Sequence, residues 1–211
     1  MRIRTALWFL LLGCLPVAAS SPLLAETPPE QEAAIKALRG MASNIQKNRD
    51  GTVRFVRFSK AMVTDEHLAH IAAFKQLDYL AVVTPTITDA GIAHVAGLAN
   101  LDTLYVSGTQ LTDAGLTALA KLEKLECLYL DETQITDAGL EHLAGLKTLK
   151  TLSLRDTNVG DAGIEKLLGL SNLKTLDLSG TKLTDSGLAR LAELKQLGTL
   201  HLVDTPVTGS G

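Results

Sequence analysis

Aspartate recurs at one place in a 24-residue period along this 211-residue chain. Carboxylates are preferred ligands of calcium, which makes the column the first candidate for chemistry, but no glycine-rich calcium nonapeptide accompanies it. Five of the six aspartates follow a threonine. This order is typical of a helix N-terminus, where the hydroxyl caps the backbone and the carboxylate complements the helix dipole. We interpret the column as structural and predict no metal site; its members are Asp65, Asp89, Asp113, Asp137, Asp161 and Asp185.

Other reactive side chains are few. His70, His94 and His142 share one place in the same period, but helices of neighbouring repeats lie about 8–10 Å apart, too far to share a metal ion without rearrangement. Cys14 and Cys127 are the only cysteines. The sequence contains no phosphate-binding glycine loop, no G-x-S-x-G elbow, no paired cysteines and no H-E-x-x-H motif. We therefore predict a protein that is not an enzyme and has no cofactor.

The amino-acid composition excludes further classes of protein. Hydrophobic residues make up 46% of the chain and aromatic residues only 4%, so the core must be aliphatic. The 20 basic and 23 acidic residues give a formal net charge of −3. This balance excludes a polybasic nucleic-acid surface and a highly charged disordered chain. The sequence predicts no nucleic-acid partner.

A repeat of 24 residues accounts for positions 53 to 208. Counted from the first residue of each repeat as 0, apolar residues stand at positions 0, 3, 5, 10, 15, 18 and 21. Six full repeats contribute seven such positions each and a partial seventh contributes four, and all of them hold Leu, Ile, Val or Phe. Alternation around positions 3 and 5 predicts a short strand with one buried face, and the three-residue spacing of positions 15, 18 and 21 predicts a short helix opposite it. The repeats start at Val53, Leu77, Leu101, Leu125, Leu149, Leu173 and Leu197.

The consensus resembles the leucine-rich repeat, whose signature is L-x-x-L-x-L-x-x-N/C-x-L. It is most similar to the repeats of exported bacterial proteins and of eukaryotic F-box adaptors, and the resemblance covers about three quarters of the chain. The resemblance implies an α/β solenoid, a horseshoe with a concave parallel β-sheet and short convex helices. The ninth position departs from the family, because it holds Ala61 and Pro85 in the first two repeats and threonine afterwards. These threonines are Thr109, Thr133, Thr157, Thr181 and Thr205.

Positions 2, 4 and 6 of each repeat face outward on the predicted concave sheet. All three tyrosines of the chain, Tyr79, Tyr105 and Tyr129, fall there on three adjacent strands. We expect Tyr105 and Tyr129 to stack about 4.8 Å apart, the spacing of strands, with Tyr79 diagonal to them. Aromatic residues often anchor interfaces, although tyrosine also simply suits strands. The predicted binding surface comprises Phe55, Arg57, Tyr79, Tyr105, Tyr129, Asp131, Arg155, Asp177 and His201.

The C-terminal half of the same face is acidic. Asp131 and Arg155 occupy the same position in adjacent repeats, so we predict a cross-strand ion pair between them; recognition of a basic partner is the alternative. Cys127 also lies on this face, as a small residue between Thr103 and Thr151 or, alternatively, as a reactive thiol. The acidic residues are Asp131, Glu132, Asp156, Asp177 and Asp204, around Arg155 and His201.

The first 19 residues have the order of a secretory signal peptide, with two arginines, an apolar run over residues 6–15 and then small residues. We predict cleavage after Ala19, with cleavage after Ser20 or Ala25 as alternatives, and an exported protein of the periplasm, the cell envelope or the extracellular space. The L-L-G-C segment ending at Cys14 also resembles a lipobox, which makes Cys14 a candidate for lipidation. The apolar run is too short for a transmembrane segment, which takes about 20 residues, and no other segment is suited to span a membrane.

Residues 20–50 are predicted to form a linker and an N-terminal cap. Apolar residues recur there at helical spacing, which favours an amphipathic helix over residues 27–48 that covers the first repeat, with Asp50-Gly51 turning into the first strand. The repeat domain then covers residues 51–211. The last repeat has no such cap, so we expect its open edge to self-associate; a truncated gene product is equally compatible. The residues beside this edge are Leu197, Leu200 and Leu202.

Together these features predict a non-enzymatic binding module of the cell envelope that recognises a protein or a glycan on its concave face. A structural envelope scaffold that self-associates through the C-terminal edge is the alternative. The F-box resemblance adds a remote third hypothesis, a substrate adaptor. No F-box-like segment precedes the repeats, and the predicted signal peptide disagrees with a cytosolic location.

Overall fold

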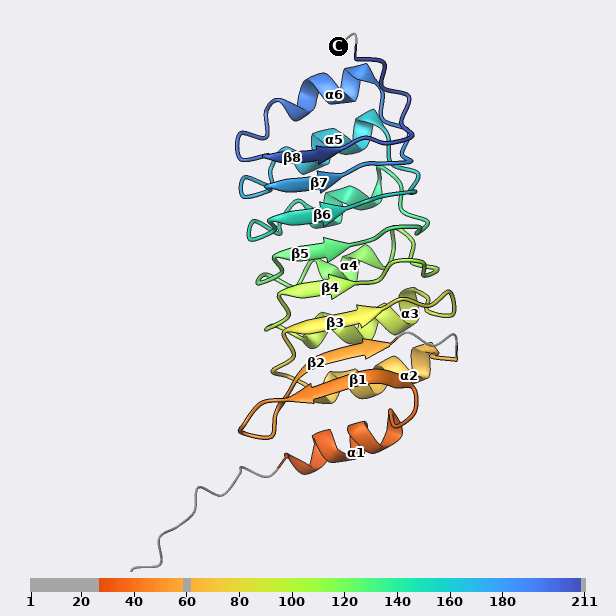
Figure 1. Cartoon of the computed structure of the whole chain (residues 1–211), viewed down its shortest axis with the longest axis vertical. Helices are drawn as coiled ribbons and strands as arrows, with labels where there is room; N and C mark the ends of the chain where they lie inside the picture. Colours follow the sequence, from red (N-terminus) through yellow and green to blue (C-terminus); the bar gives the residue numbers. More distant parts are fainter. Residues whose placement is uncertain (1–26, 59–61, 210–211) are drawn as a thin grey trace, which may run out of the picture.

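The computed structural model describes residues 27–58 and 62–209. Its repeats form one elongated stack, with a β-sheet on one side and short helices on the other (Figure 1). The predicted α/β solenoid is therefore confirmed. The predicted signal peptide over residues 1–19, with the lipidation candidate Cys14, lies outside the described residues.

Eight strands form one sheet in the order of the chain. From β2 to β8 every neighbouring pair of strands is parallel, and each residue pairs with the residue 24 positions away in the next repeat. Leu104, for example, pairs with Leu80 before it and with Leu128 after it. Equivalent positions of successive repeats therefore lie side by side. The strands are β1 (Ala42–Lys47), β2 (Val53–Phe58), β3 (Tyr79–Val82), β4 (Thr103–Tyr105), β5 (Cys127–Tyr129), β6 (Thr151–Ser153), β7 (Thr175–Asp177) and β8 (Thr199–His201).

Short helices follow each of the strands β2 to β7 on the other side of the stack. Two of them begin as the capping rule predicts: at the start of α3, Thr88 accepts a hydrogen bond from the amide of Ala90 at 3.3 Å, and at the start of α6, Thr184 accepts one from Ser186 at 3.3 Å. Helices α4 and α5 follow a glycine and have no side-chain cap. The α-helices of the repeats are α2 (Asp65–Ala69), α3 (Asp89–Ile92), α4 (Leu116–Leu119), α5 (Asp161–Leu167) and α6 (Asp185–Leu191). The 3-10 helices are η1 (His70–Ala73), η2 (Ala93–Gly97) and η3 (Gly139–Leu143).

An aliphatic core fills the space between the sheet and the helices. The seven apolar positions of the first six repeats are buried, except that Leu188 is partly buried, and the four of the seventh repeat are partly buried. Each buried side chain of this size contributes about 1.5–3 kcal/mol. Because one repeat cannot cover its own two edges, this contribution depends on the neighbours on both sides.

The aspartates of the column form hydrogen bonds to the next repeat. This role is additional to the predicted interaction of each aspartate with the dipole of its own helix. Oδ1 of Asp113 accepts the backbone N–H of Thr136 at 2.8 Å, and Oδ2 accepts the Thr136 hydroxyl at 2.6 Å. Gly160, which replaces the threonine in one repeat, donates only its backbone N–H to Asp137, at 2.6 Å. The other pairs are Asp65–Thr88, Asp89–Thr112, Asp161–Thr184 and Asp185–Thr208.

The threonine at the ninth position closes the turn after each of the strands β4 to β8. The buried hydroxyl of Thr109 donates to the carbonyl of Val106, three residues earlier, at 2.8 Å. A hydroxyl can satisfy a backbone carbonyl locally in this way, so the departure from the family's asparagine keeps a hydrogen bond in the turn. Thr133, Thr157, Thr181 and Thr205 form the same bond.

The N-terminal cap differs from the predicted helix over residues 27–48, which is wrong in its second half. Helix α1 covers only Pro29–Ala37, and residues Ala42–Lys47 form β1, antiparallel to β2. Gly40, with φ of +86°, turns the chain between the two elements. Apolar residues in this segment fit a helical spacing, but a paired strand satisfies the backbone groups at the edge of β2, which a helix cannot do.

Helix α1 still covers the first repeat as predicted. Its Ala34 and the following Leu38 are buried in the core. The buried Gln31 accepts the backbone N–H of Val53 with its Oε1 at 3.0 Å. The predicted turn before β2 is confirmed, since the N–H of Gly51 (φ +79°) donates to the carbonyl of Asn48 at 3.0 Å.

Candidate binding surface on the sheet

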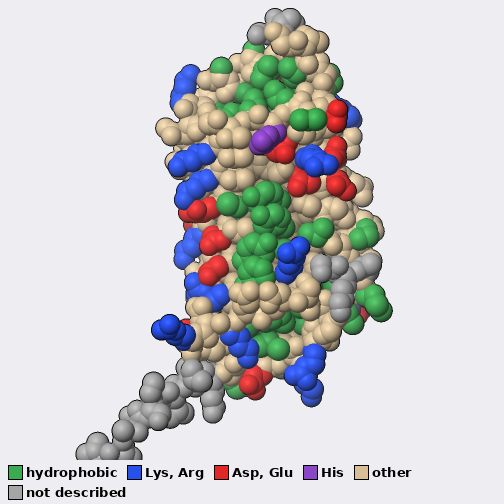
Figure 2. All heavy atoms as spheres, viewed as in Figure 1, with side chains coloured by type: hydrophobic (Ala, Val, Ile, Leu, Met, Phe, Trp, Pro, Cys, Tyr) green, Lys and Arg blue, Asp and Glu red, His purple; other side chains and the backbone are tan. Residues whose placement is uncertain are grey.

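Four aromatic rings form a continuous row on the exposed face of the sheet, and we call this row the aromatic ladder. Phe55 and Tyr79 are stacked with ring centroids 4.2 Å apart, and Tyr105 and Tyr129 are stacked at 3.9 Å. Tyr79 and Tyr105 lie 5.5 Å apart with their planes tilted by 41°. The predicted stacking, with Tyr79 diagonal, is confirmed. Figure 2 shows the resulting band of hydrophobic side chains along the middle of this face.

The register of the strands produces this row. Phe55 and Tyr79 are partners at position 2 of their repeats, and Tyr105 and Tyr129 are partners at position 4. Within each stacked pair the ring planes differ by only 10° and 4°. In each pair the two rings therefore cover one face of each other, and their edges point outward for contact with a partner.

The phenols of Tyr105 and Tyr79 both have a raised pKa. Burial raises the pKa of Tyr105, and so do a hydrogen bond with the side chain of Tyr129 and the nearby Tyr129, Cys127 and Asp131. Burial also raises the pKa of Tyr79, with Tyr105 adding to the rise and the positive charge of Arg57 opposing it. Both phenols are therefore held in their neutral form, which can donate a hydrogen bond.

We expect the wild-type protein to lose stability above about pH 10 more steeply than the variant Tyr105→Phe. The neutral phenol is favoured in the folded state. Its contribution is therefore complete below the unfolded-state pKa of about 10 and is lost as the pH rises toward the higher folded-state pKa. Phenylalanine keeps the stacked ring but has no hydroxyl to ionise. Urea unfolding followed by circular dichroism at about pH 8 and about pH 11 measures the difference; parallel losses in the two proteins would contradict the shift.

The predicted ion pair between Asp131 and Arg155 is wrong. Arg155 Nε lies 3.0 Å from Oδ2 of Asp156, which raises the pKa of the guanidinium. Asp131 instead accepts hydrogen bonds from the hydroxyl of Ser107 at 3.1 Å, the backbone N–H of Arg155 at 3.2 Å and the hydroxyl of Ser153. Because these three donors already occupy its oxygens, Asp131 links three repeats and the guanidinium turns to the next carboxylate along the chain.

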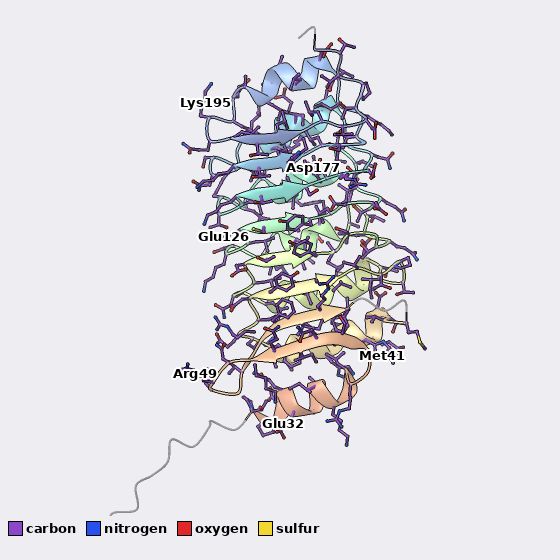
Figure 3. All side chains as sticks on the ribbon, viewed as in Figure 1. Glu32, Met41, Arg49, Glu126, Asp177 and Lys195 are labelled. Carbon is purple, nitrogen blue, oxygen red and sulfur yellow. The ribbon has the colours of Figure 1, made fainter. Side chains whose placement is uncertain are left out.

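Three other predicted acidic residues, Asp156, Asp177 and Asp204, line a groove near the C-terminal end of the face, which we call the acidic groove, whereas Glu132 is not part of its lining. Asp177 and His201 are register partners on β7 and β8, and Asp177 accepts the N–H of Ser179 at 2.9 Å. Asp177 lies on the sheet face above the aromatic ladder (Figure 3), and acidic side chains together with a basic one lie to one side of a histidine there (Figure 2). The groove is lined by Arg155, Asp156, Asp177, Ser179, Gly180, His201, Val203 and Asp204.

The structure thus brings the predicted surface residues together in two groups. Phe55 and the three tyrosines form the ladder, while Arg155, Asp177 and His201 line the groove. Asp131 lies between the two groups, and Arg57 is exposed on β2 at the opposite end of the ladder. Sequence reasoning missed Ser107 and Ser153, which hold Asp131. Their only signal is that they occupy positions 6 and 4 of the neighbouring repeats, on the same outward face.

The other features considered in the sequence are a free cysteine, a metal site and a membrane-spanning segment. Cys127 is a free, partly buried thiol between its register partners Thr103 and Thr151. Across residues 27–58 and 62–209, no three side chains of His, Cys, Asp or Glu lie close enough together to hold a metal ion. In the same part of the chain, no helix is both long and apolar enough to cross a membrane.

Comparison with known proteins agrees with the repeat pattern. Four consecutive segments match the family model described as leucine-rich repeat, over residues 97–120, 121–144, 145–168 and 169–192. A search of curated proteins gave no significant match.

Solved structures extend the likeness to the rest of the solenoid. The chain is similar to an internalin C2 from Listeria monocytogenes, with 26% identity over 89% of this chain and 88% of that one and a TM-score of 0.61. A leucine-rich-repeat protein from Leptospira interrogans shares the fold, with 22% identity, a TM-score of 0.52 and coverage of 62% of this chain and 33% of that one. The leucine-rich repeat predicted from the sequence is thus matched in four consecutive segments, and a bacterial protein of known structure has a similar solenoid.

Proposed function

We propose that this protein is a non-enzymatic binding module, exported to the cell envelope, that recognises a partner protein or glycan on the exposed face of its sheet. The aromatic ladder is the observation that carries the proposal. Only 4% of the residues are aromatic, yet four rings share this one row. The matched leucine-rich repeats, with an internalin among the similar structures, support the same class.

Folding alone does not require these rings. The equivalent positions 2 and 4 of the fifth and sixth repeats hold Thr151, Ser153, Thr175 and Asp177, and strands β6 and β7 form there with the same register. The half-buried rings that face outward at those positions in the first four repeats therefore need another reason. Tyrosine is enriched at interfaces because it offers a large apolar body and a polar tip.

Affinity capture with two matched triple variants tests the proposal. The first, Tyr79→Ala/Tyr105→Ala/Tyr129→Ala, removes the tyrosines of the ladder; the second, His70→Ala/His94→Ala/His142→Ala, alters three side chains on the helical side. We expect a cross-linked partner from the envelope fraction to be retained by the wild type and the histidine variant and lost from the tyrosine variant. Circular dichroism establishes that all three proteins are folded.

Two other outcomes would redirect the proposal. Equal capture of the partner by all three proteins would show that the ladder is not the binding surface. Capture of only further copies of the chain would favour self-association through the last repeat, where Leu197, Leu200 and Leu202 are partly buried beside β8. The mass of the protein recovered in the same experiment tests export, since removal of residues 1–19 and retention of a lipidated Cys14 give different masses.

A further inference from the structure

We infer that the partner is a polypeptide rather than a glycan, and that one of its lysine or arginine side chains enters the acidic groove while apolar side chains beside it cover the aromatic ladder. This inference rests on the proposed function and deepens it, because it assigns a chemistry and a direction to the occupant of the sheet face. Three features of the face carry it: the orientation of the rings, the carboxylates left without a cation, and the distance between the two groups.

Ring orientation disfavours a sugar. A pyranose packs its C–H groups against the electron-rich face of an aromatic ring. In the ladder one face of every ring is covered by its stacked partner, at 4.2 Å between Phe55 and Tyr79 and at 3.9 Å between Tyr105 and Tyr129, which reduces the ring faces open to a sugar. Ring edges and phenol hydroxyls remain for a partner, and they suit apolar side chains and backbone carbonyls of a polypeptide.

The charges beyond the ladder indicate which side chain of the partner lies there. Asp131 is occupied by donors of its own chain, and Asp156 is paired with Arg155. Among the described residues, no lysine or arginine forms an ion pair with Glu132, Asp177 or Asp204. Two of these three carboxylates, Asp177 and Asp204, line the acidic groove, so that end of the face presents uncompensated negative charge to a cationic side chain.

The opposite end of the face has the opposite charge. Arg57 is exposed on β2, and within the described ranges no carboxylate forms an ion pair with it. Complementary charges at the two ends fix the direction in which a partner lies along the solenoid, since the reversed orientation places like charges together.

Strand spacing gives the partner's dimensions. Tyr129 on β5 and Asp177 on β7 are two strands apart, which is about 10 Å at about 4.8 Å per strand. From Arg57 on β2 to Asp177 the separation is five strands, about 24 Å, which an extended chain covers with about seven residues. A short peptide is therefore long enough to carry all the recognised groups.

A phage-displayed library of random twelve-residue peptides, selected on the immobilised protein, tests this inference, with a panel of immobilised oligosaccharides as the second arm. We expect selected peptides to share a lysine or arginine near apolar residues. Their synthetic forms should bind the double variant Asp177→Lys/Asp204→Lys at least about tenfold more weakly than the wild type. The variant Glu66→Lys/Glu141→Lys makes the same change in net charge on the helical side and should bind as the wild type does. Circular dichroism of both variants verifies folding.

The remaining outcomes distinguish a failure of this inference from a failure of the proposed function. Peptides that need the tyrosines but bind both charge variants equally would overturn the inference and leave the proposed function standing, and so would oligosaccharides that need the tyrosines. Selected ligands that bind the tyrosine variant as well as the wild type, or the absence of any ligand in either arm, would overturn the inference together with the proposed surface.

Discussion

The substitution Gly139→Ala is expected to destabilise the protein by about 3 kcal/mol, a large cost for one added methyl group. The position that a Cβ would take at Gly139 is occupied by the carboxylate of Asp113 from the preceding repeat. That carboxylate cannot move away freely, because it holds the backbone N–H and the hydroxyl of Thr136 at 2.8 and 2.6 Å. The glycine two residues after the aspartate in the second to sixth repeats is therefore a requirement of the preceding repeat, whose aspartate lies against it. The first repeat has no such aspartate before it and holds His67 at this position.

A double-mutant cycle separates this overlap from a general effect of alanine. Asp113→Ala alone should cost about 2 kcal/mol, since Thr136 loses its acceptor. The double variant Asp113→Ala/Gly139→Ala should cost clearly less than the two single changes together, because the new methyl group then meets no carboxylate. Gly145→Ala, where a Cβ would meet nothing within 4 Å, is the control. Urea unfolding followed by circular dichroism gives all four free energies; strict additivity would contradict the mechanism.

Leu128→Ala is expected to cost about 4 kcal/mol, whereas Leu200→Ala should cost about 1 kcal/mol. Both leucines occupy position 3 of a repeat and lie at the centre of a strand, β5 and β8. Leu128 is fully buried between two neighbouring repeats, and Leu200 is only partly buried. The same chemical change thus removes different amounts of buried surface. Matched urea unfolding curves measure both costs; equal values would contradict the view that burial requires a repeat on each side.

The repeated part of the fold was predictable because the 24-residue period determines the strands, their buried face and their register together. Position 104 is leucine in a strand pattern, and its equivalents 24 residues before and after are leucine too, so strand, buried face and parallel register follow together. The cap has no copy elsewhere in the chain. In residues 42–47 an apolar residue every three or four positions fits a helix, and only the pairing with β2, a long-range contact, makes the segment a strand.

The ladder was predictable for the same reason, since residues at one position of successive repeats become neighbours. The partner of Arg155 was not, because two carboxylates lie within reach of its long side chain. The choice between Asp131 and Asp156 depends on the hydroxyls of Ser107 and Ser153, which take up Asp131. Serines on an outward strand face leave no pattern in a single sequence. The bonds from five of the six aspartates to the threonine of the next repeat were missed because both residues already had a local explanation at the helix start.

The confinement of every tyrosine to the ladder also has an optical consequence. The one tryptophan of the chain, Trp8, lies within the predicted signal peptide. A protein without its first 19 residues therefore emits only tyrosine fluorescence, and all of it comes from Tyr79, Tyr105 and Tyr129. With two of these rings stacked at 3.9 Å, any ligand that covers or separates them changes the emission directly. The proposed binding face is thus its own unlabelled reporter.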